Sequence, residues 1–223
     1  MITLKSVTKS YSLNSGESVT AVQDINVSFK EGDVIVLKGA SGSGKSTILS
    51  LIAALSKPTS GEVIVDGKKI SKLSDDFATL YRRENIGFIF QKYNLIANLS
   101  VADNIISPLV PMNLDEKEVQ QKLAKVMDMF HISHKKALHV KSLSGGEQQR
   151  VAIARANVNN PKIIIADEPT ANLDEKLSLH FIEILRELKK LGKTIIIATH
   201  DPLFFDLDLV DREIEVHNGK LVL

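Results

Sequence analysis

A glycine-rich turn between an apolar run and a helical pattern constrains the fold of this chain more than any other feature. Residues 39–47 read Gly-Ala-Ser-Gly-Ser-Gly-Lys-Ser-Thr and match the phosphate-loop pattern G-x-x-x-x-G-K-[ST]. The preceding residues 34–37 are all apolar, as in strands that are buried on both faces of a parallel sheet. A helical pattern follows, from residue 45 to about residue 55. A flexible Gly/Ser turn would need neither the apolar strand before it nor the helix after it. The pattern therefore predicts a nucleotide triphosphate site in an α/β fold.

The residues of this loop have separate tasks. Glycines let backbone N–H groups converge on phosphate oxygens, and the helix that starts at Lys45 adds the positive end of its dipole. The Lys45 ammonium can reach the β- and γ-phosphates, and the Ser46 hydroxyl can bind Mg²⁺. We therefore expect nine consecutive residues to contact the nucleotide: Gly39, Ala40, Ser41, Gly42, Ser43, Gly44, Lys45, Ser46 and Thr47.

A second apolar run, residues 163–166, ends in two carboxylates. Adjacent residues on a strand point to opposite faces, so Asp167 and Glu168 are expected to do different work. Asp167 is placed to hold Mg²⁺, as phosphate-loop enzymes require, and Glu168 is then available to polarise the attacking water. A strand that runs out into a polar turn is the alternative, and the nearby phosphate loop disfavours it.

Residues 143–150 read Leu-Ser-Gly-Gly-Glu-Gln-Gln-Arg. Ser144 and Glu147 have the spacing of a capping box, which predicts a helix over residues 148–156. Gly145 and Gly146 at its start would make a second anion site that has exposed N–H groups but no lysine. A second phosphate-binding helix tip, distant from the first, suggests that it binds a nucleotide held by another protomer.

The rest of the chain reads as one domain, residues 1–223, with a core at residues 1–91 and 158–223 and a helical lobe at residues 92–157. Helical periodicity covers residues 115–130 and 175–191, and Gly192 is expected to cap the second of these helices. Strands and hairpins are expected in seven places: residues 2–7, 20–29, 62–70, 86–90, 163–166, 194–198 and a last hairpin that turns at residues 218–219. This alternation predicts a parallel sheet with helices on it.

Composition removes several classes of protein. The formal net charge of +1 provides no basic field for nucleic acid, and the absence of cysteine excludes disulfides and thiolate metal sites. The chain opens without a signal-peptide pattern and has no apolar run of membrane-spanning length, which predicts a cytoplasmic protein that reaches a membrane only through a partner. Three basic pairs are expected to be solvated helix faces: Arg82-Arg83, Lys135-Lys136 and Lys189-Lys190.

Taken together, these motifs resemble those of the nucleotide-binding subunits of ATP-binding-cassette (ABC) transporters, in the order of that family and over the whole chain. The resemblance implies a phosphate-loop core with a parallel sheet, an N-terminal antiparallel β part and an inserted helical part. It also implies a head-to-tail homodimer that holds two ATP molecules with Mg²⁺. Each ATP would lie between the phosphate loop of one subunit and Ser144 and Gly146 of the other. Hydrolysis would drive a separate transmembrane permease subunit.

Further roles come from this resemblance, residue by residue. Tyr11 resembles the aromatic that stacks on adenine, with a buried structural tyrosine as the alternative. Gln91 resembles the glutamine that contacts Mg²⁺ and the attacking water and that links the core to the helical lobe. His200 resembles the histidine that bonds the γ-phosphate and orients Glu168. Asp174 resembles the acid that couples the two sites across the dimer. The signature residues Ser144, Gly145, Gly146 and Glu147 resemble those that bind the nucleotide of the partner.

The chain departs from the common family pattern at three positions. Ala40 stands where many relatives have proline, Glu147 where many have glutamine, and Asn172 where many have alanine. Asn172, together with residues 90–96, resembles the branch that serves lipoprotein release, macrolide export and antimicrobial-peptide resistance. None of the three departures removes a predicted reactive group.

A transport subunit has three alternatives. A soluble ABC ATPase of translation or DNA repair would usually carry two cassettes or a coiled-coil insertion, and this chain has neither. A guanine-nucleotide switch would need an [NT]-K-x-D motif, which is absent. An ABC-type regulator of cell-wall hydrolysis, which signals through a membrane partner without moving cargo, stays open.

Overall fold

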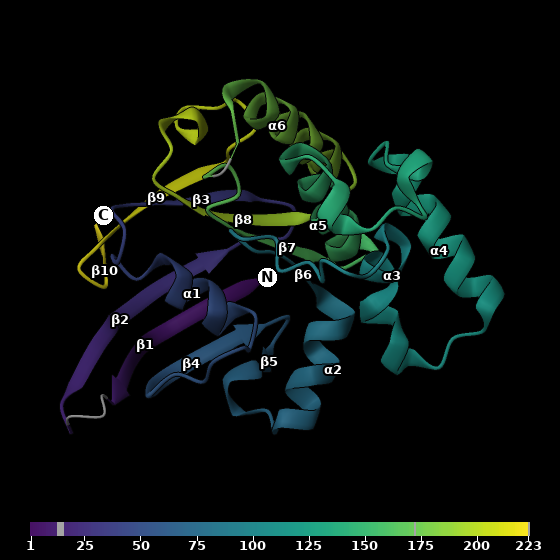
Figure 1. The fold of residues 1–223 in the computed structure, drawn as a ribbon. Helices are drawn as coiled ribbons and strands as arrows, with labels where there is room; N and C mark the ends of the chain where they lie inside the picture. Colours follow the sequence, from purple (N-terminus) through teal and green to yellow (C-terminus); the bar gives the residue numbers. More distant parts are fainter. Residues whose placement is uncertain (13–15, 172, 223) are drawn as a thin grey trace.

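The structure, a computed structural model, describes residues 1–12, 16–171 and 173–222 (Figure 1). The strands are β1 (Ile2–Ser12), β2 (Ser18–Phe29), β3 (Val34–Lys38), β4 (Ser60–Val65), β5 (Lys68–Lys69), β6 (Ile86–Ile89), β7 (Ile163–Asp167), β8 (Thr194–Thr199), β9 (Arg212–His217) and β10 (Lys220–Val222). The α-helices are α1 (Lys45–Ile52), α2 (Asp75–Asn85), α3 (Val101–Ile106), α4 (Glu116–Met129), α5 (Gly145–Asn157) and α6 (Glu175–Lys190). Short 3-10 helices are η1 (Ile70–Lys72), η2 (Ser107–Met112), η3 (Ser133–Lys135), η4 (Val140–Ser142) and η5 (Pro202–Phe204).

A mostly parallel sheet of six strands forms the centre of the molecule. Its strand order is β10-β9-β3-β8-β7-β6, in which only the pairing of β10 with β9 is antiparallel. The phosphate loop follows β3, the paired acids end β7, and His200 follows β8 between them. Parallel strands end at the same edge of a sheet, so this topology brings the three motifs together.

Alternate side chains of the central strands belong to two separate cores. On β3, Val34 and Val36 pack with α5 and α6, whereas Ile35 and Leu37 pack with α1 and the antiparallel sheet. All four side chains are almost fully buried, which explains why the strand reads as a continuous apolar run. The predicted doubly buried sheet is therefore confirmed.

The second sheet is antiparallel and covers the α1 side of the parallel sheet (Figure 1). Its strand order is β2-β1-β4-β5, and the hairpin between β4 and β5 turns at Asp66 and Gly67 as the sequence predicts. Both turn residues have positive φ, 48° and 77°, as a two-residue hairpin with the twist of its strands requires.

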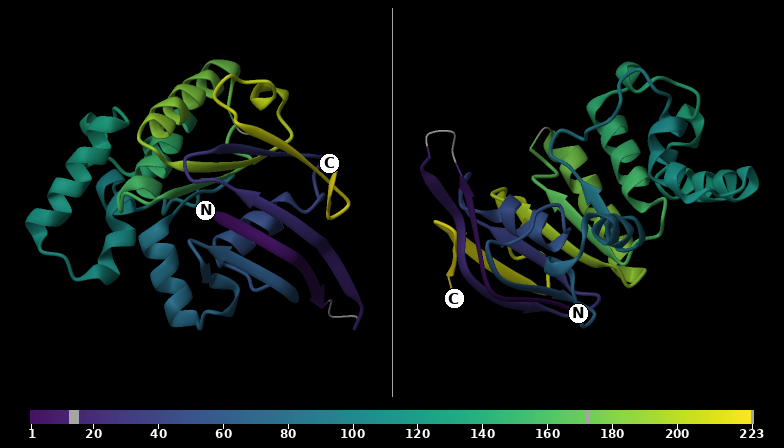
Figure 2. Two further views of the ribbon diagram at one scale, coloured as in Figure 1. Left: turned by 180° about the vertical axis from the view of Figure 1, so that it is seen from behind. Right: turned by 90° about the horizontal axis from the view of Figure 1, so that it is seen from below.

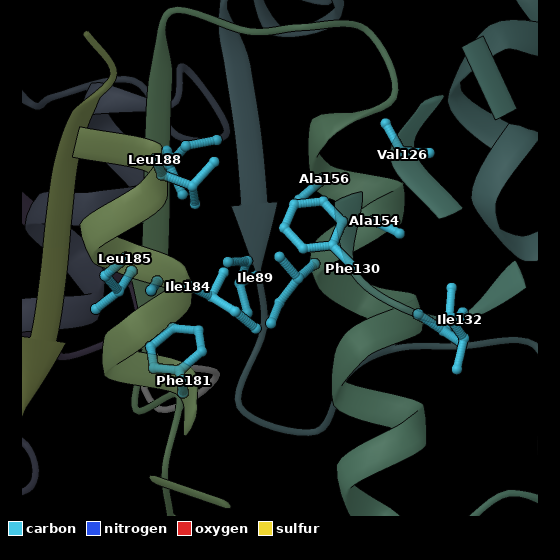
Figure 3. Packing of buried hydrophobic residues seen from close by; sticks show 14 of the residues in the cluster. Ile89, Val126, Phe130, Ile132, Ala154, Ala156, Phe181, Ile184, Leu185 and Leu188 are labelled. Carbon is cyan, nitrogen blue, oxygen red and sulfur yellow. The ribbon is translucent and has the colours of Figure 1, made fainter. Parts of the chain in front are cut away.

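Helices α3, α4 and α5 lie between β6 and β7 in the sequence, although these two strands pair directly. Figure 2 shows α3 and α4 far from the antiparallel sheet, at the other side of the molecule. Phe130, at the end of α4, joins the inserted helices to the core beside Ile89 and Ala156 (Figure 3). No helix in the described part of the chain is both long and apolar enough to cross a bilayer.

The predicted fold class is confirmed: an α/β phosphate-loop core with an N-terminal antiparallel part and inserted helices. Helix α2 was missed, because this helix is largely polar and buries only Ala78. Gly192 has a φ of 75°, and its N–H donates to the Lys189 carbonyl over 2.9 Å, so the predicted helix end is confirmed.

The expectation that the basic pairs are solvated helix faces holds only in part: Lys190 is exposed on α6 and pairs with Glu187 of the same helix, but other members of the pairs make tertiary contacts. Arg82 donates to the Ala54 carbonyl over 2.7 Å, and Lys189 donates to the Leu209 carbonyl over 2.8 Å. Lys135 lies in η3, not on an α-helix, and forms an ion pair with Glu147. Long basic side chains bury their stems while their ends bind distant carbonyls and carboxylates, and sequence spacing does not reveal such partners.

Candidate functional site

The phosphate loop is shaped by close contact with two other strands. Gly39 has a φ of 151°, and a Cβ there would lie 2.2 Å from the carbonyl oxygen of Val216 on β9. Gly44 has a φ of 108°, and its Cβ would lie 2.7 Å from the carbonyl oxygen of Ala21 on β2. Only glycine fits such positions, so close packing fixes the backbone conformation at both ends of the turn.

The two polar side chains that begin α1 are already bound within the site. Lys45 is only 4% exposed, and its Nζ donates to the carbonyl oxygens of Gly39 and Ala40 over 2.7 and 3.1 Å. The same Nζ lies 3.4 Å from a carboxylate oxygen of Glu168. The Ser46 hydroxyl donates to Asp167 over 2.9 Å. The loop of β3 and the acids of β7 therefore form one polar cluster.

Asp167 and Glu168 face different partners, as predicted, but the reason is only partly strand alternation. Glu168 has left the strand and has a φ of 44°, while its N–H donates to the Ala198 carbonyl over 2.8 Å. This left-handed turn points its carboxylate at His200, whose Nδ1 lies 3.0 Å from Oε2. Burial, followed by the nearby Glu168 charge, raises the pKa of Asp167 above its usual value, although Ser46 partly offsets this.

Lys45, Ser46, Glu168 and His200 line a cleft of about 240 Å³. Its wall consists of Ala21, Ser41, Gly42, Ser43, Gly44, Lys45, Ser46, Thr47, Gln91, Glu168 and His200. The Ser43 hydroxyl is buried and has no hydrogen-bond partner among the residues that the structure describes. A buried hydroxyl without a partner is costly, and a phosphate oxygen in the cleft would supply one. Gly39 and Ala40 line an adjoining hollow, which His200 also lines.

The signature segment forms the start of α5, outside the wall of this cleft in the part of the chain that is described. Ser144 is the N-cap, and its backbone N–H and its hydroxyl both donate to Glu147 Oε2 over 2.9 Å. The predicted capping-box residues thus lie together. The pKa of Glu147 is lowered to about 2, and the hydrogen bond from the Ser144 N–H is the largest cause. This carboxylate is therefore charged at neutral pH.

Two adjacent glycines at this helix tip offer a matched test of packing. A Cβ on Gly146 would lie 2.6 Å from Leu177 Cδ2, whereas a Cβ on Gly145 would meet no atom of the described residues within 4 Å. We expect Gly146→Ala to reduce the free energy of unfolding by about 1–2 kcal/mol, because Leu177 must move. Gly145→Ala should change it by less than about 0.5 kcal/mol. Chemical denaturation of both variants measures the difference, and equal losses would contradict this packing.

The structure places the remaining predicted residues as follows. Tyr11 on β1 is 42% exposed, so it is not a buried structural tyrosine; its ring lies 4.9 Å from Lys9 Nζ, and it does not line the cleft. Asp174 is the N-cap of α6 and accepts from the Leu177 N–H over 2.8 Å. Asp174 is thereby linked through Leu177 to Gly146. Asn172 lies outside the described residues.

Arg155 on α5 supports the segment beside the cleft, a role that the sequence analysis did not predict. Its guanidinium donates to the carbonyl oxygens of Asn94 and Tyr93 over 2.5 and 2.6 Å. Both of these residues have positive φ, so the arginine holds an unusual double left-handed turn just after Gln91. Helix α5 therefore connects the signature tip with the segment that carries Gln91. Nothing in the spacing of the sequence reveals this pair of contacts.

Comparisons with known proteins identify the family of this chain. A family described as ABC transporter matches residues 22–171, more than half of the chain. The macrolide export ATP-binding/permease protein MacB of Salmonella choleraesuis (strain SC-B67) is 39% identical over 222 residues, which cover 100% of this chain and 34% of MacB. This chain thus spans about a third of that relative.

A second relative is an ABC transporter ATP-binding protein, MJ0796, of Methanocaldococcus jannaschii. It is 43% identical over 206 residues, which cover 90% of this chain and 87% of MJ0796. A solved dimeric structure of MJ0796 superposes with a TM-score of 0.90 at 39% identity, over 100% of this chain and 97% of that one. Another, described as a post-hydrolysis state bound to ADP and Pi, superposes with a TM-score of 0.91 at 38% identity. The family match, the similarity to MJ0796 over most of both chains and the shared cassette fold together show that this chain belongs to the ABC transporter family.

Proposed function

We propose that this chain binds and hydrolyses ATP as the motor subunit of an ABC transporter. The observation that carries the proposal is the cleft itself, where Lys45, Glu168 and His200 meet beside a loop whose backbone path depends on Gly39. A cleft with a glycine-rich wall and a lysine paired with a carboxylate is suited to a triphosphate. The phosphates would bind the lysine in place of the carboxylate, and the carboxylate could then bind the attacking water. The solved MJ0796 structure that is described as bound to ADP and Pi supports the same chemistry.

Magnesium fits the chemistry of the residues at the edge of this cleft. Ser46 and Asp167 offer two hard oxygen donors that already lie 2.9 Å apart, and Gln91 adds an amide on the cleft wall. Burial, more than the nearby Glu168 charge, raises the pKa of Asp167, and a divalent cation beside this carboxylate would favour its charged form. When bound, Mg²⁺ would neutralise charge on the β- and γ-phosphate oxygens.

In the proposed reaction, a water oxygen attacks the γ-phosphorus in line with the bond to the bridging oxygen of ADP. Glu168 accepts the proton of the water as the new P–O bond forms, and the bond to ADP breaks, which yields ADP and phosphate. The His200 contact with Oε2 holds the Glu168 carboxylate in one orientation. Lys45 stabilises the negative charge that develops on the γ-phosphate.

We propose further that the working unit is a head-to-tail homodimer with two composite sites. The signature residues Ser144, Gly145, Gly146 and Glu147 do not line the cleft of their own chain, and Gly145 is exposed, with no atom of the described residues within 4 Å of where its Cβ would lie. An exposed helix N-terminus is suited to a phosphate that arrives with a second protomer. The MJ0796 cassette, whose solved structures are described as dimeric, supports this arrangement. Asp174, next to the Leu177–Gly146 contact, would couple the two sites.

The partner in the membrane would be a permease, which would place this chain at the cytoplasmic face of a membrane. The relative MacB is named as an ATP-binding/permease protein, and this chain matches only a third of it. Large apolar side chains are exposed on α2, in the segment after Gln91 and in η2: Phe77, Leu80, Ile96 and Val110. Arg83 of α2 donates to the Pro111 carbonyl over 3.1 Å and ties these elements together. We propose this surface as the permease contact, with residues 92–157 as the lobe that transmits motion.

Val110→Glu tests the proposed permease contact. Val110 is 73% exposed, and a charge there should weaken co-purification of the permease from detergent extract by about tenfold, the effect of roughly 1.4 kcal/mol. Val222→Glu, at an exposed valine on β10, is the matched control and should co-purify normally. Equal recovery with both variants would reject this surface. A cargo assay on the recovered complex then separates a transporter from a signalling ATPase that moves nothing.

A further inference from the structure

The signature tip of this chain carries a negative charge where an anion is expected to bind. Glu147 takes both the N–H and the hydroxyl hydrogen of Ser144, two donors that a phosphate oxygen could otherwise use. Its low pKa keeps the carboxylate ionised at neutral pH. A carboxylate in the first turn stabilises the helix itself, but the same charge repels an incoming triphosphate. The tip therefore needs a nearby cation if it is to bind ATP.

Lys135 supplies that cation from a different element. Its Nζ lies 3.2 Å from Glu147 Oε1, and the two side chains are 28% and 19% exposed. The Lys135 backbone is held in η3, where its N–H donates to the carbonyl of the fully buried Ile132 over 3.0 Å. A lysine beside a helix N-terminus is electrostatically disfavoured, so local helix stability does not account for its place there.

The neighbouring lysine provides a natural contrast. Lys136 donates to Gln120 on α4 over 3.0 Å and is exposed. Of the two adjacent lysines, Lys135 therefore contacts the signature tip, whereas Lys136 contacts a different helix. Removal of either one changes the net charge of the protein by the same amount. Any difference between the two variants must come from position.

We propose that Lys135 is a positioning residue that balances the charge of Glu147, so that the Ser144–Gly146 tip can accept the triphosphate held by a partner protomer. The inference rests on the proposed composite site. It also explains why the chain can carry Glu147 where many relatives have glutamine. The positive charge of Lys135 offsets the negative charge of Glu147, so the pair has no net charge, as a glutamine has none. Lys135 then acts through Glu147 and not by direct contact with phosphate.

The test uses ATP-driven dimerisation of the Glu168→Gln chain, in which hydrolysis does not obscure binding. In this background, Lys135→Met should raise the ATP concentration for half-maximal dimerisation about fivefold, as expected for a partly exposed charge pair. Lys136→Met should leave it unchanged, and Lys135→Arg should restore it. With Glu147→Gln also present, Lys135→Met should have no further effect. Light scattering after size exclusion measures the dimer, and thermal unfolding checks that all variants fold.

The outcomes separate this inference from the proposed function. If the Glu168→Gln parent fails to dimerise with ATP, the composite site is wrong, and the role of Lys135 is rejected with it. If the parent dimerises but Lys135→Met and Lys136→Met behave alike, only the inference about Lys135 is overturned. A loss with Lys135→Met that persists beside Glu147→Gln would also overturn it, because Lys135 would then contact phosphate directly.

Discussion

Glu168→Gln is expected to bind ATP normally, to form a stable dimer and to hydrolyse ATP at least about a hundredfold more slowly than the unaltered chain. The glutamine amide keeps the size of the side chain but cannot take a proton from water. In the structure, Glu168 is the carboxylate that lies between Lys45, at 3.4 Å, and His200, at 3.0 Å. These two contacts orient the Glu168 carboxylate, and its role as the proton acceptor depends on that orientation.

The same substitution should stabilise the closed dimer for an electrostatic reason. Asp167 and Glu168 bring two carboxylates close to the place proposed for the γ-phosphate, and Glu168 is among the groups that raise the pKa of Asp167. Removal of one of these charges reduces repulsion of the triphosphate. ATP should therefore be retained longer, and the dimer should persist because its nucleotides are not consumed.

A steady-state phosphate assay and size exclusion with ATP measure the two effects. Glu213→Gln is a suitable control, since this carboxylate pairs with Lys38 at 3.2 Å outside the cleft wall and should retain normal turnover. Normal hydrolysis by a monomeric Glu168→Gln chain would contradict both the role of Glu168 and the composite site.

The parts of the site that could be predicted from sequence are those in which a few consecutive residues make the whole arrangement. The phosphate loop, residues 39–47, is such a case: its glycines, its lysine and its following helix are all local, and the structure places them around one cleft. The apolar strands that end at Asp167 and, just before His200, at Thr199 were equally visible, because burial on both faces leaves a continuous apolar run. Parallel pairing then brings distant motifs to one edge.

What could not be predicted depends on tertiary partners. The sequence shows Lys135 as half of a basic pair, and only the fold brings it to Glu147. Arg155 has the same character, since its two carbonyl partners lie more than sixty positions away and are available only because their backbone is left-handed. The turn at Glu168 could not be predicted either. Strand alternation predicted that the side chains of Asp167 and Glu168 point in different directions, but the direction of Glu168 comes from its positive φ.

Ser144→Phe is expected to abolish hydrolysis while the phosphate loop of the same chain still binds ATP. Ser144 is exposed at the tip of α5, beside the open space over Gly145, and it does not line the cleft of its own chain. A phenyl ring there would occupy the space proposed for the γ-phosphate of a partner's nucleotide. Turnover should fall at least about a hundredfold, since a site that lacks its second half loses most of its transition-state contacts.

Loss of the helix cap must be separated from the effect of bulk. Any residue without the Ser144 hydroxyl weakens the start of α5, at a cost of about 1 kcal/mol. Ser144→Ala shares that loss but adds no volume, so it should keep much more activity than Ser144→Phe. Fluorescent-nucleotide titration of the monomer should give the same affinity for both variants. Reduced binding by Ser144→Phe alone would mean that the tip serves its own cleft.

Mixing two inactive variants gives the sharpest test of the composite site. Lys45→Ala lacks a functional phosphate loop but keeps its signature tip, and Ser144→Phe has the reverse defect. In a head-to-tail pair of these chains, one site contains both defects, whereas the other combines the intact Lys45 with the intact Ser144. A mixture should therefore recover hydrolysis that neither variant shows alone, and the recovery should follow the fraction of mixed dimers. Unchanged turnover by Ser144→Phe alone would reject the split site, because no partner's helix tip would then be needed for the reaction.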